Sequence, residues 1–190
     1  MYAGCKVARH RNEFAENRCL GTLKDGGYKG AARIPMTLKV TSSAFESGQG
    51  IPERFTCEGA NSSPPLQWAE VPADAKSLAL ICDDPDAPVG TWVHWVLYDL
   101  PAATVELNEK VPASETLPSG AKQGVNDFKR VGYGGPCPPQ GKLHRYYFKL
   151  YALDTNLGLK PRATKTELLR AMKGHLLAES ELMGTYRRRR

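Results

Sequence analysis

Short apolar runs bounded by Pro, Gly, Asn or Asp dominate the chain from Met36 onward. Runs of this length and composition are typical of β-strands. Strands are therefore expected over residues 38–42, 77–82, 92–100 and 145–153, and a return to period-2 alternation predicts a last strand near 177–186. The run WVHWVLYDL, at 92–100, is apolar on both faces, which predicts a central strand covered on both sides. The pattern predicts a mainly β fold.

One helix is clearly signalled. Thr164 and Glu167 form the S/T-x-x-E capping box that begins a helix. Leu168, Leu169 and Met172 follow at helical spacing, and Gly174 suits the residue just after a helix end. A helix over 164–174 is predicted as a peripheral packing element, one of few helices in the fold.

The ends of the chain differ from its middle. Residues 1–35 show no hydrophobic period and are expected to form a disordered basic extension, followed by one domain at 36–187 and a basic tail at 188–190. Of the net charge of +6, residues 1–35 contribute +4 and Arg187–Arg190 another +4, so the remaining residues carry −2. Because the basic charge belongs to the ends, no nucleic-acid partner is expected.

The lengths of the apolar runs and the number of cysteines bear on the cellular location of the protein. No run approaches the ~18 apolar residues of a membrane span, and MYAGCKVARHRNEF lacks the apolar centre of a secretory signal. The five cysteines are odd in number and form no C-x-x-C pair. A disulfide framework or zinc ribbon is therefore not expected, and a reducing cytoplasm is the predicted location.

Two motifs carry the candidate chemistry. CDDPDAPVGTWVHW, at 82–95, places aspartates and prolines just before a histidine in an apolar strand, and GYGGPCPPQGKLHRY, at 132–146, repeats the arrangement of a stiff loop and a histidine. Strand parity predicts one shared face for each of two sets: Trp92, His94, Val96 and Tyr98, and His144, Tyr146, Phe148 and Leu150.

If these strands meet, their histidines, Tyr146 and the carboxylates of Asp84 and Asp86 form a small polar pocket. Imidazoles donate hydrogen bonds to anions and gain charge near neutral pH. Read separately, the aspartates are also typical of a turn, and Asp83 is expected to be a turn residue or a helper of the pocket. His94 alone would suit a core position. Arg145 is expected to be a structural ion-pair partner of an aspartate, and Trp92 a wall of the pocket.

The quoted motifs, with NSSPPLQW at 61–68, resemble the phosphatidylethanolamine-binding protein family, also called the Raf kinase inhibitor protein family, in its bacterial and archaeal branch. The resemblance implies a β-sandwich-like fold, with a large antiparallel sheet packed on a smaller one, and an anion pocket at one end. It assigns ligand binding to seven residues: Asp84, Asp86, His94, Pro138, Pro139, His144 and Tyr146.

The resemblance also implies function. It indicates a non-enzymatic protein that binds phosphate or phosphorylated head groups and regulates kinases or proteases, with a homodimer as a plausible state and no cofactor. The alternative is a small hydrolase or metalloenzyme using Asp84, His94 and His144, with Cys137 as a further metal ligand or as a thiol nucleophile. No local pair has metal-ligand spacing, and neither G-x-S-x-G nor H-E-x-x-H occurs, so the binding function is favoured.

Overall fold

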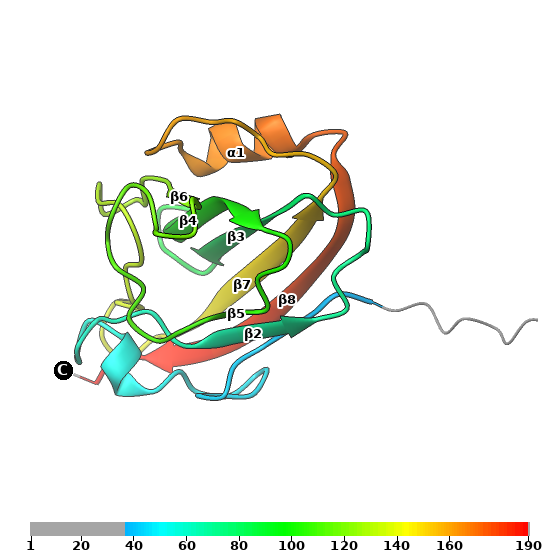
Figure 1. Ribbon diagram of the computed structural model, residues 1–190. Helices are drawn as coiled ribbons and strands as arrows, with labels where there is room; N and C mark the ends of the chain where they lie inside the picture. The colour runs from blue at the N-terminus through cyan, green and yellow to red at the C-terminus, as the bar shows by residue number, and fades with distance from the viewer. Residues whose placement is uncertain (1–36, 190) are drawn as a thin grey trace, which may run out of the picture. The chain divides into compact units, whose positions relative to one another are not determined.

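Two antiparallel sheets form the fold (Figure 1). The computed structural model describes residues 37–189, so the extension predicted for 1–35 lies outside the described residues. The three-stranded sheet has the order β1-β2-β5, and the five-stranded sheet the order β6-β4-β3-β7-β8. The bounds are β1 Lys39–Thr41, β2 Leu66–Ala69, β3 Ser77–Asp84, β4 Trp92–Pro101, β5 Glu106–Leu107, β6 Lys122–Gln123, β7 Leu143–Leu153 and β8 Leu176–Arg187.

The predicted mainly β class and the packing of a larger on a smaller sheet are confirmed. Each of the five predicted runs contains a strand, the five being β1, β3, β4, β7 and β8. The strands β2, β5 and β6 were not predicted, because two to four residues are too few to show a period. Within the described residues, no helix is both long and apolar enough to cross a membrane.

Two apolar clusters cover the two faces of the large sheet. The cluster between the sheets joins Val40 and Trp68 of the small sheet to Leu80 and Phe148 of the large one. The other cluster packs Leu168 and Met172 of helix α1 (Lys165–Met172) against the opposite face, where Figure 1 shows the helix. Central strands β3 and β4 are therefore buried on both faces, as predicted for residues 92–100.

The predicted helix signals are confirmed. The Thr164 hydroxyl accepts a hydrogen bond from the Glu167 backbone N–H, and the Glu167 carboxylate accepts one from the backbone N–H of Thr164 at 2.8 Å. At the other end, Gly174 has φ +86°, a left-handed conformation that favours glycine after a helix. A single-turn 3-10 helix, η1, lies at Glu53–Phe55.

The prediction that Val96 and Tyr98 share a face of β4 with Trp92 and His94 is wrong. Cys82 pairs with Trp95 whereas Asp83 pairs with Val93, so His94 occupies a β-bulge and has no opposite residue on β3. A bulge adds one residue and reverses the alternation that follows it. Val96 and Tyr98 consequently belong to the cluster under α1, whereas the ring of His94 contacts Tyr146 of the cluster between the sheets.

Asp83 is not a turn residue. It lies in β3, is 1% exposed, and its carboxylate binds the amines of Lys149 at 3.1 Å and Lys165 at 2.5 Å. Burial of a charge is tolerated when oppositely charged groups hold it. The side chain points to the helix side of the sheet, because Lys165 belongs to α1, and this tie anchors the first turn of α1 on the sheet.

The expectation that no disulfide forms is also wrong. Cys57 and Cys137 are 80 residues apart in sequence, yet their Cα atoms lie 5.4 Å apart and their sulfurs are bonded. Among the cysteines of the described residues, Cys82 is free and buried. The odd count and the missing C-x-x-C pair did not predict this bond, because only the fold brings the two loops together. The cysteine argument for a reducing compartment therefore fails, and a cytoplasmic location stays a prediction.

Candidate functional site

A cavity of about 220 Å³ lies where the β3–β4 connection meets the loop before β7. Five of the seven predicted ligand-binding residues line it, namely Asp84, His94, Pro138, Pro139 and His144. The other lining residues are Ala87, Pro88, Val89, Trp92, Phe128 and Cys137. The two sequence motifs thus form two walls of one cavity, and Trp92 is a wall residue as predicted.

Asp84 and His144 form a buried pair in this cavity. The Nδ1–H of His144 donates to Oδ2 of Asp84 at 2.7 Å, and the side chains are 3% and 4% exposed. Oδ1 of Asp84 accepts the backbone N–H of Asp86 at 2.8 Å. Both carboxylate oxygens are therefore engaged, and the aspartate fixes the ring of His144 so that its Nε2 is the nitrogen left for a ligand.

His94 is fixed in the same way by the backbone. Its Nδ1–H donates to the carbonyl oxygen of Gly134 at 2.5 Å, and its ring contacts the edges or faces of Phe128 and Tyr146 at centroid distances of 5.3 and 5.1 Å. Burial lowers the pKa of His94, and the Gly134 hydrogen bond and the charge of Asp84 only partly oppose this effect. The neutral ring, with Nε2 open, is therefore favoured in the free protein.

Two further buried donors lie around the cavity. Within residues 37–189, the indole N–H of Trp92 is buried without a hydrogen bond. The hydroxyl of Tyr146 neighbours Asp84, and burial, the charge of Asp84 and a hydrogen bond to it raise the pKa of Tyr146, so this hydroxyl keeps its proton. Buried polar groups almost always have partners. The unpaired indole N–H of Trp92 therefore indicates a place where a ligand or water supplies an acceptor atom.

Asp86 lies outside the lining. Its carboxylate accepts three hydrogen bonds from Arg145: from the backbone N–H at 3.0 Å, Nε at 2.9 Å and Nη2 at 2.7 Å. The guanidinium lowers the pKa of Asp86 to about 2. The structural ion-pair role predicted for Arg145 is thus confirmed. This ion pair joins the β3–β4 connection to the beginning of β7, where Arg145 directly follows His144.

Some lining residues gave no usable signal in the sequence. Phe128 belongs to an aperiodic stretch, and nothing local predicts that its ring reaches His94. Pro88 is one of the prolines expected to stiffen the aspartate motif, whereas its neighbour Val89, which is 78% exposed, has no predicted role. The alternative role of Cys137 as a thiol nucleophile or metal ligand is wrong, because its sulfur is bonded to Cys57. Among the residues described, no group of three or more His, Cys, Asp or Glu is arranged to hold a metal ion.

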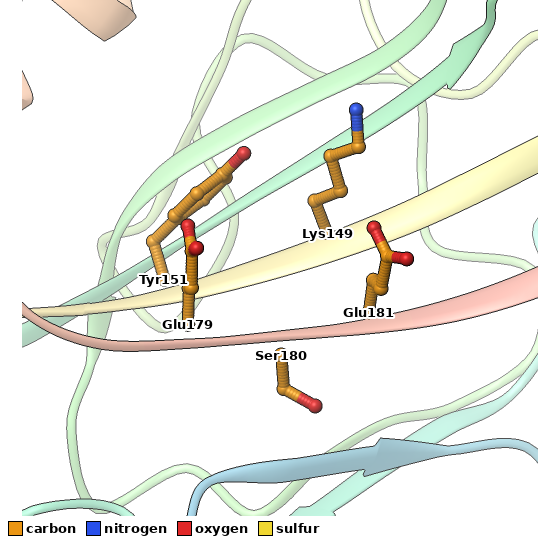
Figure 2. Close-up of a pocket in the computed structure, with 5 residues that line it drawn as sticks. All are labelled: Lys149, Tyr151, Glu179, Ser180 and Glu181. Atoms are coloured by element: carbon orange, nitrogen blue, oxygen red, sulfur yellow. The ribbon is translucent and has the colours of Figure 1, made fainter.

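A larger concavity of about 440 Å³ lies on β7 and β8, away from the histidines. Figure 2 shows Lys149, Tyr151, Glu179 and Glu181 on one side of the sheet, whereas Ser180 points to the other, where its hydroxyl accepts the backbone N–H of Val40. The amine of Lys149 is already bound to Asp83, and burial raises the pKa of Tyr151 to about 12. Among the described residues, none of the buried polar atoms without a partner belongs to the lining of this open groove.

Comparisons with known proteins agree with the fold and the motifs. The family model of the phosphatidylethanolamine-binding protein matches residues 41–187. A UPF0098 protein of Methanothermobacter thermautotrophicus is 54% identical over 151 residues, covering 80% of this chain and 99% of its own. A UPF0098 protein of Aquifex aeolicus is 49% identical over 153 residues, covering 80% and 89%.

Two solved structures are similar as well. A putative phosphatidylethanolamine-binding protein homologue from Chlamydia trachomatis has 43% identity and a TM-score of 0.74, covering 80% of this chain and 99% of its own. YbcL of Escherichia coli, described as a new member of the mammalian family, has 34% identity and a TM-score of 0.72, covering 79% and 98%.

Proposed function

Because the chain belongs to the phosphatidylethanolamine-binding protein family, we propose that it is a non-enzymatic binding protein whose histidine cavity captures phosphate or a phosphorylated group. The observation that carries this proposal is the set of hydrogen-bonding groups that the cavity leaves for a ligand. Each oxygen of Asp84 already accepts a hydrogen bond within the protein, and the Nδ1 atoms of His94 and His144 are occupied, so their Nε2 atoms remain. Within residues 37–189, the indole N–H of the wall residue Trp92 is buried without a partner.

The two imidazoles suit a phosphate in either protonation state. A neutral ring with its proton on Nδ1 accepts a hydrogen bond at Nε2 from a P–OH group, whereas an imidazolium donates to a phosphate oxygen. Asp84 and Gly134 hold the two Nδ1–H groups, so both rings keep these orientations when the cavity is empty. Groups held in their binding geometry before the ligand arrives lose less entropy on binding.

The hydrolase alternative receives less support from the same geometry. The Asp84–His144 pair is placed as a general base would be, but no Ser, Thr or free Cys is among the residues that line the cavity. Such an enzyme would have to activate water. A steady release of phosphate from p-nitrophenyl phosphate that is lost in the His144→Ala variant would favour hydrolysis over binding.

Calorimetric titration with sulfate and inorganic phosphate tests the proposal. His94→Ala and His144→Ala are each expected to weaken sulfate binding by about 1.5–3 kcal/mol, the range for a hydrogen bond to a charged group. His175→Ala is the matched control, because His175 is exposed, pairs with Asp154 and does not line the cavity. Circular dichroism establishes that each variant is folded.

Full sulfate affinity in both folded histidine variants would contradict the proposal. Parallel titrations with vesicles that contain phosphatidylethanolamine separate a lipid head group from a free phosphate. Binding to the vesicles alone identifies the lipid, and binding to free phosphate alone identifies a small molecule.

A further inference from the structure

A second cavity of about 190 Å³ adjoins the histidine cavity. Phe128 and Cys137 line both, so the two cavities share a wall made of one aromatic ring and one end of the disulfide. The remaining residues that line this side cavity are Cys57, Asn61, Asn126, Arg130, Tyr133, Gly134 and Gly135. The two cavities therefore lie on either side of this shared wall.

The loops around the side cavity are held by hydrogen bonds of their own. Oδ1 of Asn61 accepts the backbone N–H of Gly135 at 2.7 Å. The amide of Asn126 donates to the carbonyl of Gly132 at 2.9 Å and accepts the backbone N–H of Arg130 at 3.1 Å. The hydroxyl of Tyr133 donates to the carbonyl of Phe55 at 2.9 Å. The side-chain oxygens of Asn61 and Asn126 are thus already used as acceptors within the protein.

The donors left over are the Nδ2 amide of Asn61 and the guanidinium of Arg130. The guanidinium forms no ion pair or hydrogen bond with any residue in the described range 37–189, in contrast to Arg145 and Arg162, which bind carboxylates. No carboxylate lines the side cavity. A pocket with open donors and a planar cation suits a carboxylate or a phosphate, since the guanidinium fork matches their two oxygens.

From this arrangement we infer that the side cavity binds a second anionic group of the same ligand, with Arg130 as the residue that selects it. This inference rests on the proposed capture of a phosphate in the histidine cavity and narrows the ligand class. The preferred ligand carries a phosphate and, a few bonds away, a carboxylate or a second phosphate. A ligand whose other end is only an ammonium gains nothing from Arg130.

O-phosphoethanolamine and O-phosphoserine form a matched pair of probes, because they differ by one carboxylate. Calorimetry on the full chain is expected to show that O-phosphoserine binds about threefold to fivefold more tightly, the effect of one partly exposed ion pair. Arg130→Ala should abolish this preference and leave the affinity for inorganic phosphate unchanged. Arg130→Lys should retain part of it, since an ammonium keeps the charge and loses the fork.

Arg170→Ala serves as the control, because it removes the same charge from the exposed surface of α1 and lines neither cavity. It should keep the preference for O-phosphoserine. Equal affinities for the two probes, or a preference that survives in Arg130→Ala, would overturn the inference and leave the proposed function standing if inorganic phosphate still binds. Failure of inorganic phosphate to bind would remove both.

Glycerophosphoserine identifies the source of the ligand. It carries the same carboxylate on a phosphodiester, as in a lipid head group, whereas O-phosphoserine is a free phosphomonoester. Dependence on Arg130 with either compound supports the inference. The tighter of the two then assigns the site to a lipid head group or to a free phosphorylated metabolite.

Discussion

At the scale of single residues, the cavity depends on how the protein uses its own hydrogen-bonding groups. One oxygen of Asp84 accepts from His144 and the other from the backbone of Asp86, so this carboxylate orients both groups while it also lines the cavity. His94 is held by a carbonyl and buried beside Tyr146. Without its Nδ1 partner, either imidazole ring could rotate, and its Nε2 would no longer be held in position for a ligand.

The depressed pKa of His94 predicts how anion binding depends on pH. Burial favours the neutral ring in the free protein, whereas a bound dianion favours the imidazolium. The complex therefore binds more protons than the free protein between the two pKa values, and linkage requires the affinity to rise as pH falls. Sulfate binding should tighten from about pH 8 to about pH 6, a range that includes the ~6.5 reference pKa of histidine. Because the pKa of His94 is lowered, binding should continue to tighten below that range.

Calorimetry with sulfate at constant ionic strength measures this slope. Sulfate is the cleaner probe, because it stays doubly charged over the range in which phosphate gains a proton. His94→Gln should flatten the profile, while His175→Ala should not. A pH-independent sulfate affinity in the unsubstituted protein would show that neither imidazole is protonated on binding.

At the scale of elements, the His94 side chain at the β4 bulge and the helix α1 lie on opposite faces of the large sheet. The bulge turns His94 toward the cavity and sends Val96 and Tyr98 to the face under α1. The helix covers that face with Leu168 and Met172 and contributes Lys165 to the buried carboxylate of Asp83. The helix thus stabilises the sheet without contributing a residue to the lining of the cavity.

Thr164→Ala is expected to lower stability without affecting binding. It removes the hydroxyl that accepts the Glu167 backbone N–H, and loss of such a cap costs about 1 kcal/mol, or a melting temperature lower by roughly 2–4 °C. Thr164→Ser keeps the hydroxyl and should melt close to the unsubstituted protein. Thermal unfolding followed by circular dichroism measures both. A fall in sulfate affinity in folded Thr164→Ala would contradict the separation of helix and cavity.

At the scale of the whole molecule, the Cys57–Cys137 disulfide ties the loop after η1 to the loop that ends at the cavity wall. The same two loops are also joined by the Gly135–Asn61, Tyr133–Phe55 and Cys57–Pro136 hydrogen bonds. The loop before β7 is therefore held by more than its covalent link. The disulfide should matter more for resistance to unfolding than for the shape of the cavity.

Replacing both cysteines, in Cys57→Ser/Cys137→Ser, is expected to lower the free energy of unfolding by about 2–4 kcal/mol. The reason is that a cross-link between residues 80 apart restricts the unfolded chain strongly. The melting temperature should fall by roughly 5–15 °C while sulfate affinity changes little. Adding a reductant should lower the melting temperature of the unsubstituted protein and leave that of the double variant unchanged. An unsubstituted, oxidised protein in which both thiols are alkylated without reduction would show that the bond does not form.

The sequence alone was enough to predict the mainly β class, the five longer strand regions, the capped helix and the two motifs that supply the cavity. These features depend on local pattern. Apolar runs between turn residues, a capping box at Thr164 and a glycine suited to left-handed backbone act within a few residues of one another. The motif resemblance added the pairing of the two histidine loops, and the cavity contains both histidines and Asp84.

Only the tertiary structure decided the rest, because those features depend on contacts between residues far apart in the chain. One inserted residue at His94 changes which face Val96 and Tyr98 occupy, and a bulge leaves no local mark in an apolar run. Asp83 becomes an interior anion because Lys149 and Lys165 arrive from β7 and α1. The disulfide, the ring of Phe128 at His94 and the guanidinium of Arg130, unpaired among residues 37–189, likewise depend on where separate loops meet.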